Sequence, residues 1–364
     1  EHLAMSESVG MINLSHFPII DIKGPDAERM LEYLSVAKVG GDIPEGKIIY
    51  TNFLDEDGGV HADLTISRLE SDNFRVVTGG ADGNRDWVTL RNYRDDNGLE
   101  SNISIKTHDI ATLGLWGPKA ANALSNFIDP NEITIENFPF ATTKNLTLNL
   151  IGGKKLEVWA ARISYVGESG WEIYFSNNKQ DGLALYDSLL EVGVVPVGIE
   201  TYANSRRLEK SFRLQGADLE TEYTSVEAAI QRPLVKESNF HGKVAHLAQR
   251  EEDPCAILCT MTVDDLNVSG CYRYPVGISP IIDPTTGEVP IDSKGRRSYT
   301  TGMSYCPSIR KFVVMGYLPK EIAFNGKSLL LEYFNEDGDG LYPMTVQIVG
   351  KGSLYDPKNE RVRS

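Results

Sequence analysis

The sequence lacks the features that mark membrane and secreted proteins. It contains no run of about 18 consecutive apolar residues, so no transmembrane helix is indicated. Residues 1–10 show no basic stretch followed by an apolar one, so no signal peptide is visible. We therefore expect no association with a membrane.

Basic side chains are also scarce. The chain has 36 Lys and Arg against 51 Asp and Glu, which gives a formal net charge of -15. A nucleic-acid-binding protein needs a basic face that displaces counterions. The longest basic cluster, at residues 294–297, is more typical of a solvated loop. We therefore expect no nucleic-acid partner.

Motifs for nucleotides, metals and serine nucleophiles are missing. No Gly-x-Gly-x-x-Gly follows a strand-like segment, and neither a Walker Gly-x-x-x-x-Gly-Lys-Ser/Thr nor a Gly-x-Ser-x-Gly elbow occurs. The 6 histidines are scattered, and so are the 4 cysteines, Cys255, Cys259, Cys271 and Cys306. We expect this chain alone to bind no flavin, nicotinamide or metal. The cysteines fit reduced side chains in a reducing compartment, the cytoplasm or alternatively the mitochondrial matrix.

Length and composition indicate a globular protein of more than one domain. The chain has 364 residues, 41% of them hydrophobic, which is more than one hydrophobic core supports. Residues 1–10 already contain apolar positions and lead into a strand-like segment, as in a chain that starts inside a fold. Near residues 245–255 helical patterns give way to short strand-like segments, at 256–263, 312–318, 328–333 and 342–349. We predict one domain at 1–250 and an all-β barrel or sandwich at 251–364.

Two segments of the first half share a strand, a Gly-Pro turn and a helix. They run through residues 19–36 and 113–128, and each Gly-Pro pair follows an apolar strand-like stretch. Pro is tolerated in the first turn of a helix, and apolar residues in 27–34 recur at helical spacing. The pattern predicts a β-α-β module used twice. The alternative is that Gly-Pro simply interrupts a loop.

A hairpin is predicted between these segments. Strand-like residues 48–54 and 60–66 flank the turn sequence Asp-Glu-Asp-Gly-Gly at 55–59. Alternation places one set of side chains on an apolar face, Val60, Ala62, Leu64 and Ile66, and the other on a polar face, His61, Asp63 and Thr65. A third strand is expected at 74–78. Further strands are expected at 156–163 and 171–175, and helices at 182–192 and 199–210.

One segment resembles a known family. Residues 162–174, Arg-Ile-Ser-Tyr-Val-Gly-Glu-Ser-Gly-Trp-Glu-Ile-Tyr, resemble the signature of the glycine cleavage T-protein (aminomethyltransferase) family, in which Tyr-Thr-Gly-Glu-x-Gly-Trp/Phe-Glu is typical. Three more segments resemble the family in the same order: Tyr50 with Gly58, Gly59, Asp63 and Leu64, then residues 204–210, then residues 300–305. These matches span nearly the whole chain.

Within the family, the resemblance is greatest to the folate-binding C-terminal half of dimethylglycine and sarcosine dehydrogenases. It rests on residues 1–15, 163–165, 208–213 and 317–319. A flavin domain precedes this half in those proteins, so we expect a flavin-containing dehydrogenase domain or subunit as a partner.

The sequence also departs from the family pattern. Val166 stands in place of the signature Thr, Ser225 in place of a usual Pro, and Arg206 in place of a usual Leu. Residues 280–297 resemble an extra loop.

The resemblance implies both a fold and a reaction. The fold is of the α+β class: an aminomethyltransferase-like folate-binding fold of β-α-β modules with antiparallel sheets at 1–250, and a C-terminal all-β barrel. The reaction is transfer of a one-carbon unit from an N-methylated amine such as dimethylglycine or sarcosine, or its iminium, to tetrahydrofolate, giving 5,10-methylenetetrahydrofolate. Two alternatives are folate-dependent demethylation of an O-methyl or S-methyl compound, and a folate-binding module without catalysis.

The resemblance assigns roles to five residues. Asp63 is the expected catalytic carboxylate, which positions the folate nitrogen and stabilises positive charge in the transition state. Glu172 is expected to accept the amino group and the adjacent ring N–H of the pterin as a fork. Tyr50 and Tyr165 are expected to bind the cofactor beside the pterin, and Arg207 to bind its glutamate tail.

Structural interpretations of the same residues stay open. On their own, Asp63 and Glu172 fit solvent-facing strand residues, and Tyr50 fits an aromatic residue at the edge of a core. Arg207 fits a helix with ion pairs along one face, although Arg206, three residues from Glu209, fits that role better. If Asp63 is structural, Glu168 is the next candidate for catalysis.

Overall fold

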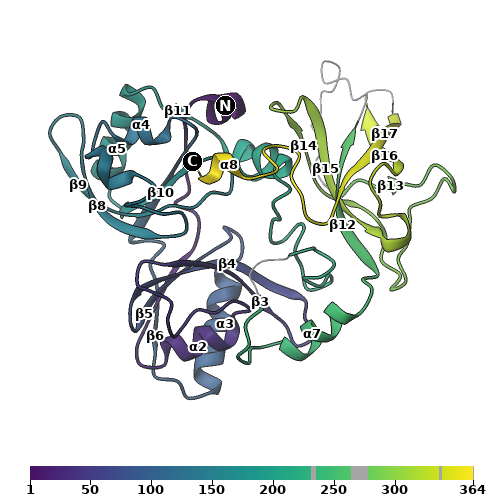
Figure 1. The fold of residues 1–364 in the computed structure, drawn as a ribbon, viewed down its shortest axis with the longest axis horizontal. Helices are drawn as coiled ribbons and strands as arrows, with labels where there is room; N and C mark the ends of the chain where they lie inside the picture. The colour runs from purple at the N-terminus through teal and green to yellow at the C-terminus, as the bar shows by residue number, and fades with distance from the viewer. Residues whose placement is uncertain (231–234, 264–277, 336–337, 364) are drawn as a thin grey trace.

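The computed structural model describes residues 1–230, 235–263, 278–335 and 338–363. Three sheets form three lobes around a central region, which contains the short helical segment at 201–209 (Figure 1). No helix in the described part of the chain is long and apolar enough to span a membrane.

The first lobe is an antiparallel sheet of five strands in the order β3-β4-β5-β2-β6. Its elements are β2 (Ile19–Lys23), α2 (Ala27–Leu34), β3 (Ile48–Leu54), β4 (Val60–Glu70), β5 (Asn73–Thr78), α3 (Gly83–Asp96) and β6 (Asn102–Ile105). Ala62, Leu64 and Ile66 are at most 3% exposed and belong to the core of this lobe, whereas the alternate residues of β4 are half-buried. The predicted hairpin and its two faces are confirmed.

The second lobe is a sheet of six strands in the order β11-β1-β7-β10-β9-β8. Its elements are α1 (His2–Glu7), β1 (Gly10–Asn13), β7 (Ile110–Trp116), α4 (Ala120–Leu124), the 3-10 turn η1 (Pro130–Ile133), β8 (Thr143–Asn149), β9 (Lys155–Ala161), β10 (Gly170–Ser176), α5 (Lys179–Glu191) and β11 (Val195–Pro196). One face of this sheet packs on α4 and α5, and the other face turns toward the first lobe through Trp159 and Tyr174.

Both predicted Gly-Pro turns connect a strand to a helix. Gly24 has φ +142° and Gly117 has φ +138°, a region that residues with side chains rarely adopt. A Cβ at Gly117 would also lie 2.4 Å from the carbonyl oxygen of Ser8. The two helices that follow end earlier than predicted, at Leu34 and Leu124.

Residues 199–210 do not form the single regular helix that the sequence predicts. They fold as the π-helix η2 (Thr201–Arg206) followed by the short helix α6 (Arg207–Glu209). π-Helical turns are rare and occur mainly at functional sites. In this geometry two consecutive arginines are buried with different carboxylates, Arg206 with Glu168 and Arg207 with Asp218.

The third lobe is a sheet of six strands in the order β13-β16-β17-β12-β15-β14. Its elements are β12 (Ala256–Val263), β13 (Ile281–Ile282), β14 (Thr300–Cys306), β15 (Lys311–Pro319), the 3-10 turn η4 (Lys320–Ile322), β16 (Ser328–Asn335) and β17 (Gly338–Val349). Backbone hydrogen bonds from Ile281 N to Ser298 O (3.2 Å) and from Thr300 N to Ser279 O (2.9 Å) join its two edges. The sheet therefore curves into the predicted barrel.

Two interpretations of residues 280–297 hold only in part. The segment is not merely an extra loop, because it includes β13, which pairs with β16 at one edge of the barrel. Lys294, Gly295 and Arg297 are exposed, as expected of a solvated loop, but Arg296 is not. Its side chain is 9% exposed and forms ion pairs with Glu227 and Asp292, a long-range arrangement that the local sequence does not reveal.

Residues after the barrel return to the other lobes. Helices α7 (Lys243–Glu251) and α8 (Glu360–Arg363) flank the barrel strands in the sequence, and Figure 1 places α8 between the second and third lobes.

The predicted domain boundary at residue 250 stays a prediction. Residues from both sides of it, such as Val60, Leu208, Leu258 and Met315, share one hydrophobic cluster.

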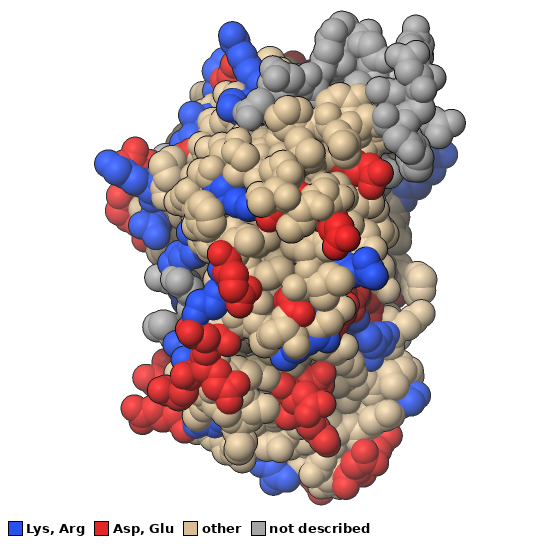
Figure 2. Space-filling model, turned by 90° about the vertical axis from the view of Figure 1, so that its right-hand side faces the viewer, with Lys and Arg blue, Asp and Glu red and all other residues tan. Residues whose placement is uncertain are grey.

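The charged surface is mixed. On the face shown in Figure 2, acidic side chains gather toward the lower end and basic ones are scattered among uncharged residues. That face carries no continuous basic patch over the residues described.

Candidate functional site

Asp63 on β4 accepts a hydrogen bond from β3. The strand register places Asn52 directly opposite Asp63. Asn52 Nδ2 donates to Asp63 Oδ1 at 2.7 Å. Burial raises the pKa of Asp63 to about 7, although Asn52, the nearby Tyr50 hydroxyl and the charge of Arg213 act in the opposite direction. Asp63 is therefore a carboxyl that gains or loses its proton near neutral pH.

Tyr50, near Asp63, is exposed at the surface. Its side chain is 41% exposed, whereas that of Asn52 is 2% exposed. Desolvation of its hydroxyl end and the neighbouring Asp63 carboxylate raise the pKa of Tyr50 well above its ordinary value. Tyr50 therefore stays protonated and remains a hydrogen-bond donor.

Glu172 is a second buried acid, on β10. The Tyr174 hydroxyl donates to Glu172 Oε2, and the Glu172 side chain is 8% exposed. Burial raises the pKa of Glu172 to about 7, and within the described chain no basic side chain opposes this effect. Glu172 therefore has the character of an acceptor for N–H groups of a ligand rather than of a structural ion pair.

Aromatic side chains connect the surroundings of the two acids. The Tyr165 ring lies 5.3 Å from that of Tyr202, which comes from η2, and 5.9 Å from that of Phe212. Burial and the nearby Glu172 charge raise the pKa of Tyr202 well above its ordinary value. Burial likewise raises the pKa of Tyr165, whose hydroxyl donates to Arg213 O at 2.6 Å. The result is an aromatic wall between Asp63 and Glu172.

Arg207 does not face a ligand in this arrangement. Its side chain is 1% exposed, and its Nη1 pairs with Asp218 Oδ2 at 2.5 Å. It also donates to the carbonyl oxygens of Ala203 (2.5 Å) and Phe212 (3.1 Å). This geometry argues against direct contact with a folate tail and makes Arg207 a residue that positions its neighbours.

Arg213, rather than Arg207, supplies a positive charge near Asp63. It is half-buried, and its charge acts on Asp63, Tyr50 and Tyr165. Its guanidinium donates to the carbonyl oxygens of Ala228, Ser211 and Gly350, at 3.0, 2.5 and 2.9 Å. These bonds hold a positive charge beside the Asp63 end of the aromatic wall.

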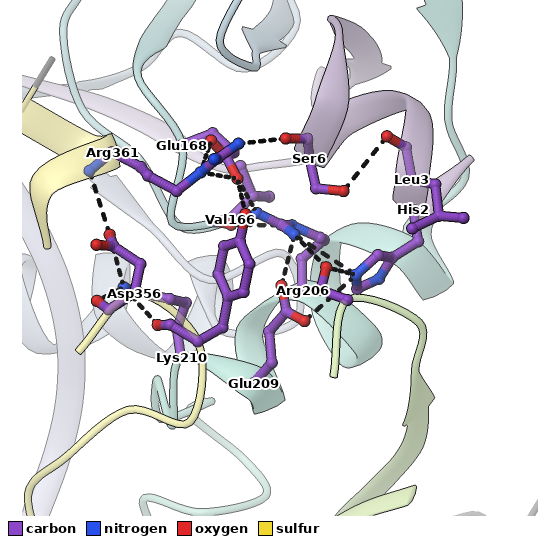
Figure 3. Close-up of polar contacts among 12 residues, drawn as sticks. His2, Leu3, Ser6, Val166, Glu168, Arg206, Glu209, Lys210, Asp356 and Arg361 are labelled. Carbon is purple, nitrogen blue, oxygen red and sulfur yellow. Dashed lines mark hydrogen bonds and ion pairs between the residues drawn. The ribbon is translucent and has the colours of Figure 1, made fainter. Parts of the chain in front are cut away.

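Glu168 is engaged elsewhere. It is 1% exposed and accepts hydrogen bonds from Arg206 Nη2 at 2.5 Å and Arg361 Nε at 2.9 Å (Figure 3). Arg206 also pairs with Glu209, which lies 3.3 Å from His2 Nε2. This network joins α1, the segment between β9 and β10 that contains Glu168, the helical segments η2 and α6, and the C-terminal helix α8. Glu168 is thus a structural residue in this geometry rather than a second candidate for catalysis.

No metal site is visible in the described part of the chain, where no group of three or more His, Cys, Asp and Glu could hold an ion. Cys255 is half-buried, Cys259 and Cys306 are buried, and all three are free thiols. Cys271 lies outside the described residues.

Comparison with known proteins decides the family. The model of the GCVT N-terminal domain matches residues 1–237. The chain belongs to the glycine cleavage T-protein (aminomethyltransferase) family. Among its relatives in the family, the aminomethyltransferase of Corynebacterium aurimucosum is 30% identical over 266 residues, which cover 71% of this chain and 68% of that protein.

Mitochondrial dimethylglycine dehydrogenases are also relatives. That of Rattus norvegicus is 30% identical over 358 residues, which cover 95% of this chain but 38% of the dehydrogenase. The chain thus spans well under half of that relative. The crystal structure of aminomethyltransferase T from Bartonella henselae superimposes with a TM-score of 0.77 at 22% identity and covers 95% of this chain and 87% of that one. This likeness confirms the predicted aminomethyltransferase-like fold.

The sequence prediction missed four residues of the site: Asn52, Tyr174, Tyr202 and Arg213. One of them had a local signal, because alternation along β10 places Tyr174 on the face of Glu172. The predicted hairpin would pair Asn52 with Ala62, and Asn52 lies opposite Asp63 only because the register shifts between Phe53 and Leu54. The other two come near the acids only through long-range packing.

Proposed function

We propose that this chain binds tetrahydrofolate between its lobes and uses it to accept a one-carbon unit from an N-methylated amine. The observation that carries this proposal is a pair of carboxyls, the half-buried Asp63 and the buried Glu172, each with its pKa raised to about 7 and connected by an aromatic wall. Membership of the aminomethyltransferase family supports it.

Glu172 fits the role of pterin acceptor. A reduced pterin offers an amino group and an adjacent ring N–H, and an ionised carboxylate accepts both as a fork. The Tyr174 hydroxyl holds Oε2 in place, and the nearby rings of Tyr165 and Tyr202 offer apolar faces to a flat ring system. Because no basic side chain pairs with Glu172 in the described residues, its acceptor capacity is available to a ligand.

Asp63 fits the role of the catalytic carboxylate. Transfer from an iminium to tetrahydrofolate breaks the C=N bond of the iminium and two folate N–H bonds, and it forms two carbon–nitrogen bonds to the folate. One of the two protons goes to the leaving amine, and the other is released to water. Positive charge therefore develops on nitrogen, and an ionised carboxylate nearby stabilises it. A carboxyl whose pKa is about 7 can also take the released proton.

The donor that we favour is a methylated amine such as dimethylglycine or sarcosine, because a dimethylglycine dehydrogenase matches 95% of the chain. Conversion of such an amine to its iminium removes two electrons. We propose that a flavin-containing dehydrogenase domain or subunit accepts them. We place the reaction in the cytoplasm or, alternatively, in the mitochondrial matrix. Folate-dependent O- or S-demethylation and folate binding without catalysis remain the alternative functions.

Calorimetric titration with tetrahydrofolate tests the binding step. We expect saturable heat with tetrahydrofolate and a strong loss of binding in Glu172→Gln. The matched control is Glu157→Gln, because Glu157 is an exposed residue of the neighbouring strand β9. Absence of heat at millimolar tetrahydrofolate would refute the proposal, whichever amine is the donor.

A further inference from the structure

The amide of Asn52 is built into the Asp63 site. Asn52 lies on β3, opposite Asp63 in the register, and is 2% exposed. Its Nδ2 donates to Asp63 Oδ1 at 2.7 Å. A buried amide with an ionisable acceptor is costly unless the hydrogen bond is made, and hydrogen bonds to charged groups are the stronger ones.

We propose that Asn52 is a positioning residue for the transfer reaction: its amide anchors Oδ1 of Asp63 to strand β3, keeps the carboxylate in one orientation and favours its ionised form. This inference rests on the proposed function, in which Asp63 is catalytic. Asn52 itself touches no substrate in this account. It acts only through the Asp63 carboxylate.

The surroundings of Asn52 on β3 are mostly neutral. Asn52 borders a small cavity of about 10 Å³ with Val36, Ser225, Ile230, His246 and Arg250. Ser225 Oγ and His246 Nδ1 lie 2.9 Å apart, and burial lowers the pKa of His246 to about 4. His246 is therefore neutral at the pH of the reaction. Arg250, exposed at the end of α7, is the one charged group that borders the cavity.

The other groups that face Asp63 are titratable, whereas the Asn52 amide is not. Tyr50 is a nearby hydroxyl, Arg213 is a cation, and Asp82 is a like charge whose effect opposes ionisation. Tyr165 also senses the Asp63 charge. All four are titratable groups, whereas the Asn52 amide donates at every pH.

His61 lies two residues from Asp63 on the same face of β4. It hydrogen-bonds to Thr89, and burial lowers its pKa below the ordinary value. This shift favours the neutral form of the His61 side chain.

The test is the pH profile of one-carbon transfer in Asn52→Leu, which removes the donor at similar volume. Loss of a hydrogen bond to a charged group should raise the apparent pKa of Asp63 by about one unit. Transfer should then fall about fivefold near pH 7 and return to within about twofold of the wild type near pH 9. Asn52→Gln, which keeps an amide, should restore part of the rate near pH 7.

The matched control is Asn102→Leu, because Asn102 is exposed on β6 of the same sheet. It should leave the profile unchanged. A loss in Asn52→Leu that is the same at all pH values, or no loss at all, would overturn the inference.

A second measurement separates this inference from the proposed function. Carbon-13 NMR of labelled aspartate carboxyls, without any folate, follows ionisation of the Asp63 side chain, which Asp63→Asn identifies by loss of the signal. The inference requires a higher midpoint in Asn52→Leu than in the wild type, and equal midpoints would contradict it. If the midpoint rises but neither protein transfers carbon to tetrahydrofolate, the proposed function fails and the positioning of Asp63 by Asn52 stands.

Discussion

Replacing Glu172 by Gln removes a charge at the centre of the proposed pterin site and little else. The side chain is 8% exposed, and Gln keeps its shape and an acceptor for the Tyr174 hydroxyl. It presents an amide NH₂ to the pterin amino group, where the wild type presents a carboxylate oxygen. Losing one partner of a charge-assisted fork in a buried site costs about 2–4 kcal/mol, which weakens binding of tetrahydrofolate by about 30- to 700-fold.

The pKa of Glu172 also predicts the direction in which the affinity for tetrahydrofolate changes with pH. The pKa of Glu172 in the free protein is about 7, and the ligand binds the ionised form. Binding should therefore tighten as the pH rises through about 7 and then level off, and this dependence should vanish in Glu172→Gln. Titration calorimetry at several pH values measures both effects. An unchanged dissociation constant in the variant, with the Glu157→Gln control also unchanged, would refute the assignment of Glu172.

Three further predictions follow from the buried charges. Asp63→Asn should bind tetrahydrofolate normally but slow transfer by roughly 10²–10³-fold, and comparison of single-turnover rates with calorimetry checks this. Asp63 and Glu172 bind protons more tightly in the folded than in the unfolded protein, so they destabilise the fold as the pH rises from about 4 to above 7. Asp63→Asn and Glu172→Gln should thus each raise the free energy of unfolding near pH 8, by about 1–3 kcal/mol in urea titrations, and should not do so near pH 4. Arg207→Met should destabilise the fold by about 3–5 kcal/mol, because it leaves Asp218 buried and unpaired; a variant as stable as the wild type would show that the pair is dispensable.

Local patterns in the sequence predicted the parts of the fold that local chemistry determines. Alternation and the Asp-Gly-Gly turn placed the β3–β4 hairpin and both of its faces, and the Gly-Pro pairs marked two strand-to-helix turns that need a positive φ. The same alternation placed Asp63 on the polar face of its strand. The raised pKa of Asp63 did not follow, because it depends on burial in the folded chain and on the charge of Asp82, which comes from another segment.

Long-range contacts account for most of the errors. The sequence gives no sign that Arg207 is buried against Asp218, since a charged residue on a helix is usually exposed. The π-helical turn at Thr201–Arg206 accompanies the burial of Arg206 against Glu168, which comes from another lobe. Segment 280–297 looked like a loop because β13 is two residues long and is recognisable only through its pairing with β16.

One-carbon transfer to tetrahydrofolate can be measured without the flavin partner. Sarcosine and formaldehyde condense in water to the N-methylene iminium that oxidation of dimethylglycine would produce. The purified chain is mixed with this donor and tetrahydrofolate, and 5,10-methylenetetrahydrofolate is followed by mass spectrometry against the uncatalysed reaction. We expect a rate well above that background in the wild type and close to it in Asp63→Asn. A wild-type rate equal to the background, or an equally fast Asp63→Asn variant, would contradict it.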